Sequence, residues 1–162
     1  PEVIVASSCS KNFGLYRERT GSITFITKTP QQADIVISQA MSTARSIYSM
    51  PPAHGALLVS MVLGDPDLNC QWRSELEEVR LRIKAMRGLL CDNLAGNPAG
   101  MNFSHIKHQK GMFSFLGINS SQLERLREEF GIYIVSSTRV NLAGVNSTNI
   151  DHLTKSLLKV LQ

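Results

Sequence analysis

The chain has few cysteines, few aromatic residues and no long apolar run. Its three cysteines, Cys9, Cys70 and Cys91, are odd in number and form no CxxC pair. This pattern disfavours a disulfide framework and favours reduced thiols in a cytoplasmic compartment. No stretch approaches the roughly 18 apolar residues of a membrane span, and this piece carries no charged and apolar leader segment. We therefore expect no membrane partner.

The chain also lacks a basic patch interleaved with aromatic residues. Its net charge of +4 is compatible with a nucleic-acid partner, but the basic residues alternate with glutamates at residues 75–82. That alternation is typical of a solvated helix face, so we expect no nucleic acid. His105 and His108 have no cysteine or carboxylate beside them, so we also expect no metal site.

The first half of the chain predicts two strands followed by a helix. Residues 3–7 form a continuous apolar run, which is typical of a strand covered on both faces, as in a parallel sheet. Residues 21–27 predict a second strand. Thr29 is placed to cap a helix that begins at Pro30 and ends near Tyr48.

Two further helices follow. Residues 53–63 are apolar nearly all round and predict a buried helix ended by Gly64. Residues 66–95 carry apolar side chains at spacings of three and four, with Trp72 as a core residue on that stripe. Such a helix spans some 45 Å at ~1.5 Å per residue, more than one compact domain needs. We therefore expect it to bridge two domains.

The remainder of the chain alternates between predicted strands and helices, as in a small α+β domain. Strands are predicted at residues 101–108, 111–116 and 132–135. Ser121 and Glu124 are spaced as a capping box for a helix that Gly131 closes. A last helix packs four apolar side chains: Ile150, Leu153, Leu157 and Leu161.

The segment that follows the first strand concentrates the chemistry. It holds the amine of Lys11 together with the hydroxyls of Ser8 and Ser10 and the guanidinium of Arg19. An amine beside other cations can stay partly uncharged and form a Schiff base with a carbonyl, while hydroxyls and a guanidinium bind phosphate. Pyridoxal phosphate carries both groups. The alternative from these residues alone is a solvated lysine in a charged surface turn.

Four blocks of sequence, in this order, carry a resemblance to a known family. They are SCSKNFGLY with ERTG (residues 8–21), SMPPAHG (residues 49–55), GMFSF (residues 111–115) and RVNLAG (residues 139–144). Together they resemble the aspartate and aromatic-amino-acid aminotransferases, which are class I, fold-type I pyridoxal-phosphate enzymes. Members of that family are much longer and carry the lysine well past the middle. The chain therefore resembles a C-terminal portion.

The resemblance implies an α/β fold that is the C-terminal part of a fold-type I transferase. Residues 1–75 correspond to the remainder of the large cofactor-binding domain, and residues 76–162 to the small C-terminal domain that closes on the substrate. The helix at residues 66–95 joins them. The family members are homodimers, so we expect a homodimer of the full-length enzyme.

The resemblance also implies roles for single residues. Lys11 is the cofactor lysine and carries a proton, and Ser8, Ser10 and Arg19 bind the cofactor phosphate. Arg139 and Arg45 hold the two carboxylates of a dicarboxylic substrate, Arg45 from across the dimer interface, and Phe113 lines the pocket. From the residues alone, the favoured interpretation of Arg45 is a helix C-terminal arginine that interacts with the helix dipole, and that of Arg139 is a solvated turn residue.

The implied reaction is exchange of an amino group between an amino acid, with aspartate expected, and 2-oxoglutarate. A fragment of the aromatic type is an alternative, as is a stand-alone non-catalytic domain. Thr138 stands where the family usually has glycine, so the turn before Arg139 is expected to differ. The carboxylate that pairs with the pyridine nitrogen lies outside this chain in the family. We therefore expect the 162-residue piece to be inactive alone.

Overall fold

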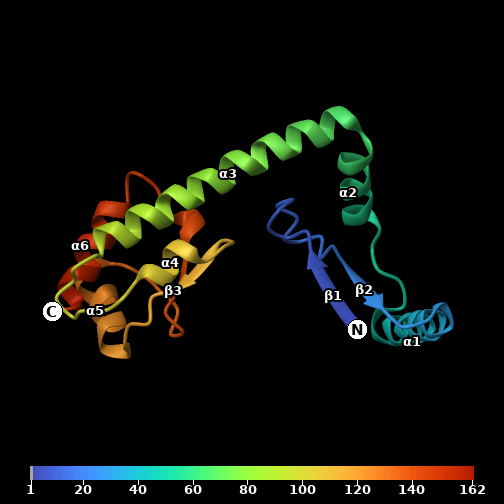
Figure 1. Ribbon diagram of the computed structural model, residues 1–162, viewed down its shortest axis with the longest axis horizontal. Coiled ribbons are helices and arrows are strands. Elements are labelled where there is room, and N and C mark those ends of the chain that lie inside the picture. Colours follow the sequence, from blue (N-terminus) through green and yellow to red (C-terminus); the bar gives the residue numbers. More distant parts are fainter. Residues whose placement is uncertain (1) are drawn as a thin grey trace. The chain divides into compact units, whose positions relative to one another are not determined.

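The computed structural model describes residues 2–162 as a mixture of helices and short strands. Contacts between Cα atoms divide the chain into two compact units, residues 1–76 and 77–162. The division falls inside α3 (Pro66–Asn93), which is one continuous helix (Figure 1). Each unit is described by itself.

The first unit begins with two antiparallel strands, β1 (Val3–Ser8) and β2 (Gly21–Ile26). A Cβ added at Gly21 would lie 2.2 Å from the Ser7 carbonyl oxygen, so this close approach requires glycine. Both predicted strands are confirmed. The predicted parallel, doubly covered environment is wrong, because β1 pairs antiparallel with β2 and no residue of β1 is buried. An apolar run favours burial, but it does not specify which other segment of a protein covers the strand.

Helix α1 (Pro30–Tyr48) begins and ends where the sequence predicts. The Thr29 hydroxyl accepts a hydrogen bond from the Gln32 amide at 3.2 Å, which caps the first turn. The helix packs against β2 through a stripe of half-buried positions at helical spacing. These positions are Ala33, Val36, Ala40 and Ala44.

Helix α2 (His54–Gly64) ends at Gly64 as predicted. The prediction that it is buried is wrong for this chain, because Leu57 and Met61 are 63% and 62% exposed. Among residues 2–76 only Ser10 and Gly55 are buried, and no hydrophobic side chain is. The apolar character was predicted correctly, but the described residues contain no surface that covers it. An apolar surface of this extent is typical of a contact region.

Helix α3 begins at a side-chain cap. The Asp65 carboxylate accepts hydrogen bonds from the amides of Asp67 and Leu68 at 2.9 and 3.0 Å. Pro66 occupies the first helical position, as predicted. The helix ends at Asn93, and Gly96 follows in the left-handed region at φ 68°.

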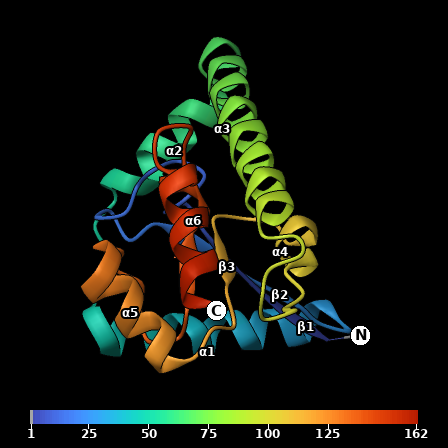
Figure 2. The ribbon, with the colours of Figure 1, turned by 90° about the vertical axis from the view of Figure 1, so that its left-hand side faces the viewer.

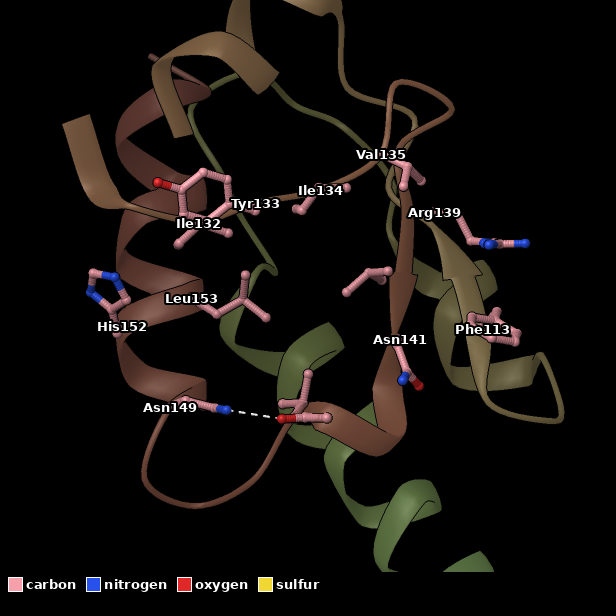
Figure 3. A pocket seen from close by; sticks show the side chains of 13 residues that line it. Phe113, Ile132, Tyr133, Ile134, Val135, Arg139, Asn141, Asn149, His152 and Leu153 are labelled. Carbon is pink, nitrogen blue, oxygen red and sulfur yellow. Dashed lines mark hydrogen bonds between the residues drawn. The ribbon is translucent and has the colours of Figure 1, made fainter. Parts of the chain in front are cut away.

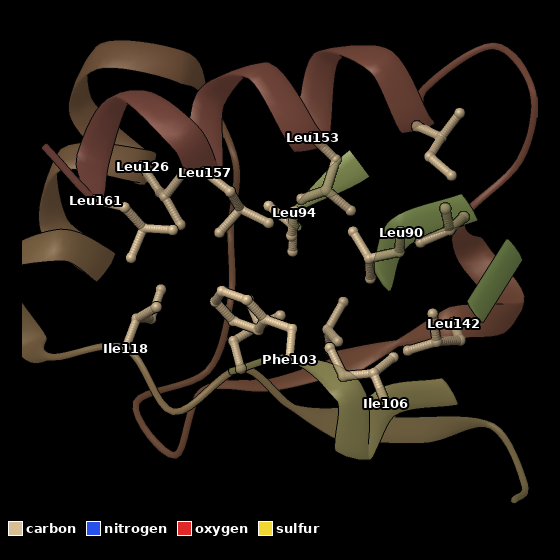
Figure 4. Close-up of a cluster of buried hydrophobic side chains, with 14 of the residues drawn as sticks. Leu90, Leu94, Phe103, Ile106, Ile118, Leu126, Leu142, Leu153, Leu157 and Leu161 are labelled. Atoms are coloured by element: carbon tan, nitrogen blue, oxygen red, sulfur yellow. The ribbon is translucent and has the colours of Figure 1, made fainter. Parts of the chain in front are cut away.

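The second unit holds the hydrophobic core. Its elements after α3 are α4 (Ser104–His108), β3 (Phe113–Phe115), α5 (Ser120–Phe130), β4 (Arg139–Asn141), the short 3₁₀ helix η1 (Leu142–Gly144) and α6 (Ile150–Val160). β3 and β4 are antiparallel, and α5 packs against α6 (Figure 2). Side chains from α3, α4, α5, β4, η1 and α6 form one cluster with residues of the connecting segments, and Leu90, Leu126 and Leu157 are fully buried in it (Figure 4).

The last helix confirms its predicted face. Ile150, Leu153, Leu157 and Leu161 are all buried. Gly131 closes α5 in the left-handed conformation at φ 64°, also as predicted. The region at residues 111–116 is confirmed as a strand in its central part, β3.

Three predictions for this unit are wrong. Residues 101–108 contain the helix α4 instead of a strand, because the Asn102 side chain accepts from the Ser104 amide and begins a turn. The capping box of α5 is formed by Asn119 and Gln122, not by Ser121 and Glu124. Residues 132–135 form no strand. The strand lies later, at β4, so Arg139 begins a strand instead of following one.

Candidate functional site

The Lys11 loop, residues 8–20, runs from the last residue of β1 to the start of β2, and these two strand ends are paired. The Cys9 amide donates to the Thr20 carbonyl at 2.9 Å and closes the base of the loop. The Ser8 hydroxyl donates to the Ser10 hydroxyl at 3.0 Å and accepts from the Ser10 amide at 3.2 Å. Ser10 is buried. The loop therefore holds two hydroxyl groups together at the end of the strand.

The two cations of interest lie on the same loop and share Tyr16 as a neighbour. The Lys11 Nζ lies over the Tyr16 ring, 4.2 Å from its centre, in a cation–π contact. The Arg19 guanidinium donates to the Tyr16 carbonyl at 3.1 Å. Arg19 has φ 51°, a left-handed conformation that costs a non-glycine residue about 1–2 kcal/mol. Backbone strain of this kind clusters at ligand-binding positions.

Contacts that were not predicted support the loop from outside. The Trp72 indole, on α3, donates to the Asn12 carbonyl at 2.9 Å and stacks on Phe13 with ring centres 4.5 Å apart. His54, at the start of α2, lies 2.9 Å from the Glu18 carboxylate. Trp72 was predicted only as a core residue, and it is half-buried. Its sequence spacing gives no signal for a partner some sixty residues earlier.

The donor groups of the Lys11 loop suit one kind of small molecule. The exposed amine of Lys11 can react with an aldehyde, while the hydroxyls of Ser8 and Ser10 and the Arg19 guanidinium can donate hydrogen bonds to a phosphate. The residues present therefore fit a ligand that carries both an aldehyde and a phosphate.

Arg45 lies elsewhere in the first unit. It is exposed in the last turn of α1, where its carbonyl accepts from the Ser49 amide at 2.9 Å. No hydrogen bond among the described residues joins it to the Lys11 loop. Ser49, which follows α1, has φ 64°.

The second predicted group lies on the β3–β4 ribbon, residues 113–115 and 139–141. Phe115 is opposite Arg139 in the register, so Phe113 is its diagonal neighbour on the same face. The Arg139 guanidinium carbon lies 4.6 Å from the centre of the Phe113 ring. Figure 3 shows both side chains on the side of the ribbon that faces away from α6. The structure thus brings together the two residues predicted to contact substrate in this unit.

Thr138, directly before Arg139, adopts the backbone conformation that glycine favours, with φ 65°. Its side chain is buried, and its hydroxyl accepts a hydrogen bond from the Gly117 amide at 3.0 Å. Its carbonyl accepts from the Leu116 amide at 3.0 Å. Threonine therefore holds a left-handed turn at this position through hydrogen bonds that glycine could make only in part.

A buried arginine was not predicted as a functional residue. Arg87, on α3, is 3% exposed and donates to groups of the segment that leads into β3. Burial lowers the pKa of its guanidinium. A signal was available in the sequence, because Arg87 stands on the apolar stripe between Ile83 and Leu90.

A hollow of about 470 Å³ lies beside the ribbon, between residues 132–135, β4 and the start of α6 (Figure 3). Its walls are mostly apolar, and the side-chain Nδ2 of Asn149 donates to the Gly144 carbonyl at 2.9 Å on one side. Arg139 and Phe113 are among the residues that line it. The apolar part of the wall does not suit a carboxylate, whereas the Arg139 guanidinium can donate hydrogen bonds to one, so the candidate carboxylate site is at Arg139.

Within the part of the chain that the structure describes, no three His, Cys, Asp or Glu side chains gather as metal ligands. No helix over residues 2–162 has the length and apolar content that crossing a membrane requires.

The chain matches a family model for aminotransferase class I and II over residues 1–157. It is 46% identical over 160 residues to an aspartate aminotransferase from Haemophilus influenzae. That alignment covers 99% of this chain but 40% of the relative, so the chain spans less than half the length of such relatives.

Two solved structures agree closely with the fold. One is an aromatic-amino-acid aminotransferase from Burkholderia pseudomallei covalently bound to pyridoxal phosphate (TM-score 0.90, 44% identity, 99% of this chain and 40% of that chain). The other is an aromatic amino acid aminotransferase from Psychrobacter sp. B6 cocrystallised with aspartic acid (TM-score 0.90, 43% identity, 98% and 40%). The predicted α/β, fold-type I class is confirmed. The chain belongs to the class I and II aminotransferase family.

Proposed function

We propose that the chain is the C-terminal portion of a pyridoxal-phosphate-dependent aminotransferase in which Lys11 is the cofactor lysine. The observation that carries this proposal is the Lys11 loop, which places one amine, two hydroxyls and one guanidinium on a single connection between β1 and β2. Residues 1–75 are then the remainder of the cofactor-binding domain, and residues 76–162 the substrate-closing domain. The pyridoxal phosphate bound to the Burkholderia relative supports the choice of cofactor.

The residues of the Lys11 loop have separate roles in cofactor binding and proton transfer. Ser8, Ser10 and Arg19 bind the phosphate through charge-assisted hydrogen bonds, which are stronger than neutral ones. When bound, pyridoxal phosphate supplies an aldehyde for condensation with amines and a ring that withdraws electrons from the substrate Cα. Lys11 Nζ holds the cofactor and moves the proton at the substrate Cα as a general acid and base.

Substrate carboxylates are bound by arginines, which offer two parallel donors that lysine lacks. Arg139 binds the α-carboxylate, with Phe113 lining the pocket, and Arg45 binds the side-chain carboxylate within a homodimer. The amino group passes between aspartate and 2-oxoglutarate in a cytoplasmic enzyme. A relative cocrystallised with aspartic acid supports this substrate class. An aromatic-amino-acid preference is the alternative, because the similar proteins include both aspartate and aromatic-amino-acid aminotransferases.

A stand-alone, non-catalytic domain is the candidate from another class. We regard it as the weaker one, because residues 2–76 bury no hydrophobic side chain of their own. For the same reason we expect the isolated 162-residue chain to be inactive.

The test compares the full-length protein with its Lys11→Ala variant in the reaction of aspartate with 2-oxoglutarate. Loss of a general acid–base group lowers kcat by roughly 10²–10⁴-fold, and loss of the cofactor amine adds to that. The same assay on the 162-residue chain should show no turnover. Full activity of the Lys11→Ala variant would overturn the proposal.

A second variant separates the two substrate classes. Arg45→Leu should raise KM for aspartate by roughly 10- to 100-fold, because a hydrogen-bonded charge pair contributes about 1.5–3 kcal/mol. KM for phenylalanine should stay unchanged. An equal rise in KM for aspartate and phenylalanine would show that Arg45 does not bind the side-chain carboxylate.

A further inference from the structure

The guanidinium of Arg87 has an unusual environment: it is buried, and its hydrogen-bond acceptors include no carboxylate. One terminal nitrogen donates to the Ile106 carbonyl at 3.0 Å and to the Ser114 hydroxyl. The other donates to the carbonyls of Gly111 and Phe113 at 2.8 and 2.9 Å. The Nε atom is buried and has no hydrogen-bond partner among the described residues.

Burying a charge without a counter-charge is costly, so the arrangement needs a compensating gain. Here three carbonyl dipoles and one hydroxyl converge on the cation, and all four belong to residues 106–114. The Ser114 hydroxyl in turn donates to the Gln109 side chain at 2.7 Å. Arg87 therefore fixes the backbone that leads into β3 and fixes β3 itself.

The β3–β4 ribbon links the buried Arg87 guanidinium to the predicted substrate-binding residues, because its two faces carry different side chains. Ser114 and Val140 are paired in the register and buried on the inner face. Phe113 and Arg139 lie on the outer face, with the guanidinium carbon of Arg139 4.6 Å from the ring centre. Arg87 donates hydrogen bonds to both the Phe113 carbonyl and the Ser114 hydroxyl, so it contacts the backbone that carries the Phe113 ring.

We propose that Arg87 is a positioning residue for substrate binding: it anchors β3 from within, so that Phe113 presents its ring to the guanidinium of Arg139. This inference rests on the proposed role of Arg139 as the ligand of the α-carboxylate. A free arginine side chain has many rotamers, and the ring contact restricts them before substrate binds. Arg87 touches neither substrate nor cofactor in this scheme.

The test uses the full-length enzyme and separates binding from chemistry. Arg87→Met should raise KM for the amino acid by roughly 3- to 30-fold, the equivalent of losing one cation–π contact and its ordering. kcat should change less than about twofold. Succinate, which offers carboxylates but no amine, should lose affinity by the same factor as KM rises. Ser114→Ala removes one of the four contacts and should show a smaller effect of the same kind.

Two further variants distinguish positioning from a general loss of stability. Leu157→Ala creates a cavity in the same core and should lower thermal stability without changing KM. Arg87→Lys keeps the charge but has one nitrogen for four acceptors, so it should restore KM only in part. If Arg87→Met fails to fold, the KM values of Ser114→Ala and Arg87→Lys test the proposal instead.

The outcomes separate this inference from the proposed function. If Arg139→Lys leaves KM unchanged, the proposed role of Arg139 is wrong and the inference falls with it. If Arg139→Lys raises KM while Arg87→Met and Ser114→Ala do not, only the positioning role is wrong. An equal rise of KM in Leu157→Ala would also overturn the positioning role, because general destabilisation would then explain it.

Discussion

We expect Trp72 to stabilise the Lys11 loop against local opening. Its indole makes two contacts with the residues that directly follow Lys11: the hydrogen bond to the Asn12 carbonyl and the stack on Phe13. Trp72→Phe removes the donor and keeps an aromatic ring, while Trp72→Leu removes both contacts. The two variants therefore measure the contacts in turn.

The magnitudes follow from the type of each contact. A hydrogen bond in an exposed setting contributes about 0.5–1 kcal/mol net. An aromatic stack adds about 0.5–1.5 kcal/mol. The equilibrium constant for local opening of the loop should therefore rise about twofold to fivefold in Trp72→Phe, and about fivefold to seventyfold in Trp72→Leu.

Amide hydrogen exchange of the full-length protein measures the equilibrium constant for local opening of the Lys11 loop. The amides of Cys9 and Phe13 donate to carbonyls within the Lys11 loop at 2.9 and 3.2 Å, so they exchange only when the loop opens. Arg73→Leu is the matched control, because Arg73 is the next residue on α3 and its guanidinium donates within the helix, to the Asn69 side chain. Unchanged exchange of both amides in Trp72→Leu would refute the reasoning.

Three other outcomes are expected. Gly55→Ala should destabilise the contact between α2 and the Lys11 loop, because the new Cβ would lie 1.9 Å from the Thr20 hydroxyl; thermal denaturation of the full-length protein checks this. The hydrogen bond from Arg125 lowers the pKa of Glu129 in the folded protein. The pair therefore stabilises the fold at pH values above the ordinary pKa of glutamate. This stabilisation is lost as the pH falls through the lowered pKa of Glu129. Arg125→Met should return the Glu129 pKa toward its ordinary value in an NMR titration. Leu157→Ala should cost about 2–5 kcal/mol in urea denaturation, since the side chain is fully buried.

Local signals in the sequence predicted most helix boundaries correctly. Thr29 before Pro30 and Gly131 after the last turn of α5 are signals that act within one turn of helix. The element types at these points depend on neighbouring residues alone. For that reason they could be predicted without knowledge of the rest of the fold.

Features that depend on distant partners were predicted less well. The direction of pairing of β1 depends on β2, and the register of the β3–β4 ribbon joins segments 26 residues apart. The four acceptors of Arg87 come 19 to 27 residues later in the chain. Nothing in the local pattern specifies these pairings.

Thr138 is an intermediate case. The resemblance to the family implied that threonine stands where glycine is usual, and a different turn was expected. The structure keeps the left-handed conformation at φ 65°, with the hydroxyl accepting from the Gly117 amide. A tertiary hydrogen bond therefore offsets part of the local strain, and local propensity alone does not predict this.

The central claim is that Lys11 is the amine that binds pyridoxal phosphate. The most direct measurement is reductive trapping: the protein is incubated with a low concentration of pyridoxal phosphate, reduced with borohydride, digested, and the modified lysine located by mass. Lys11→Ala and a variant of the exposed Lys28 serve as paired controls. We expect selective modification of Lys11 in the full-length protein, lost in Lys11→Ala and kept in the Lys28 variant. Diffuse modification of many lysines, or selective modification that persists in Lys11→Ala, would contradict the claim.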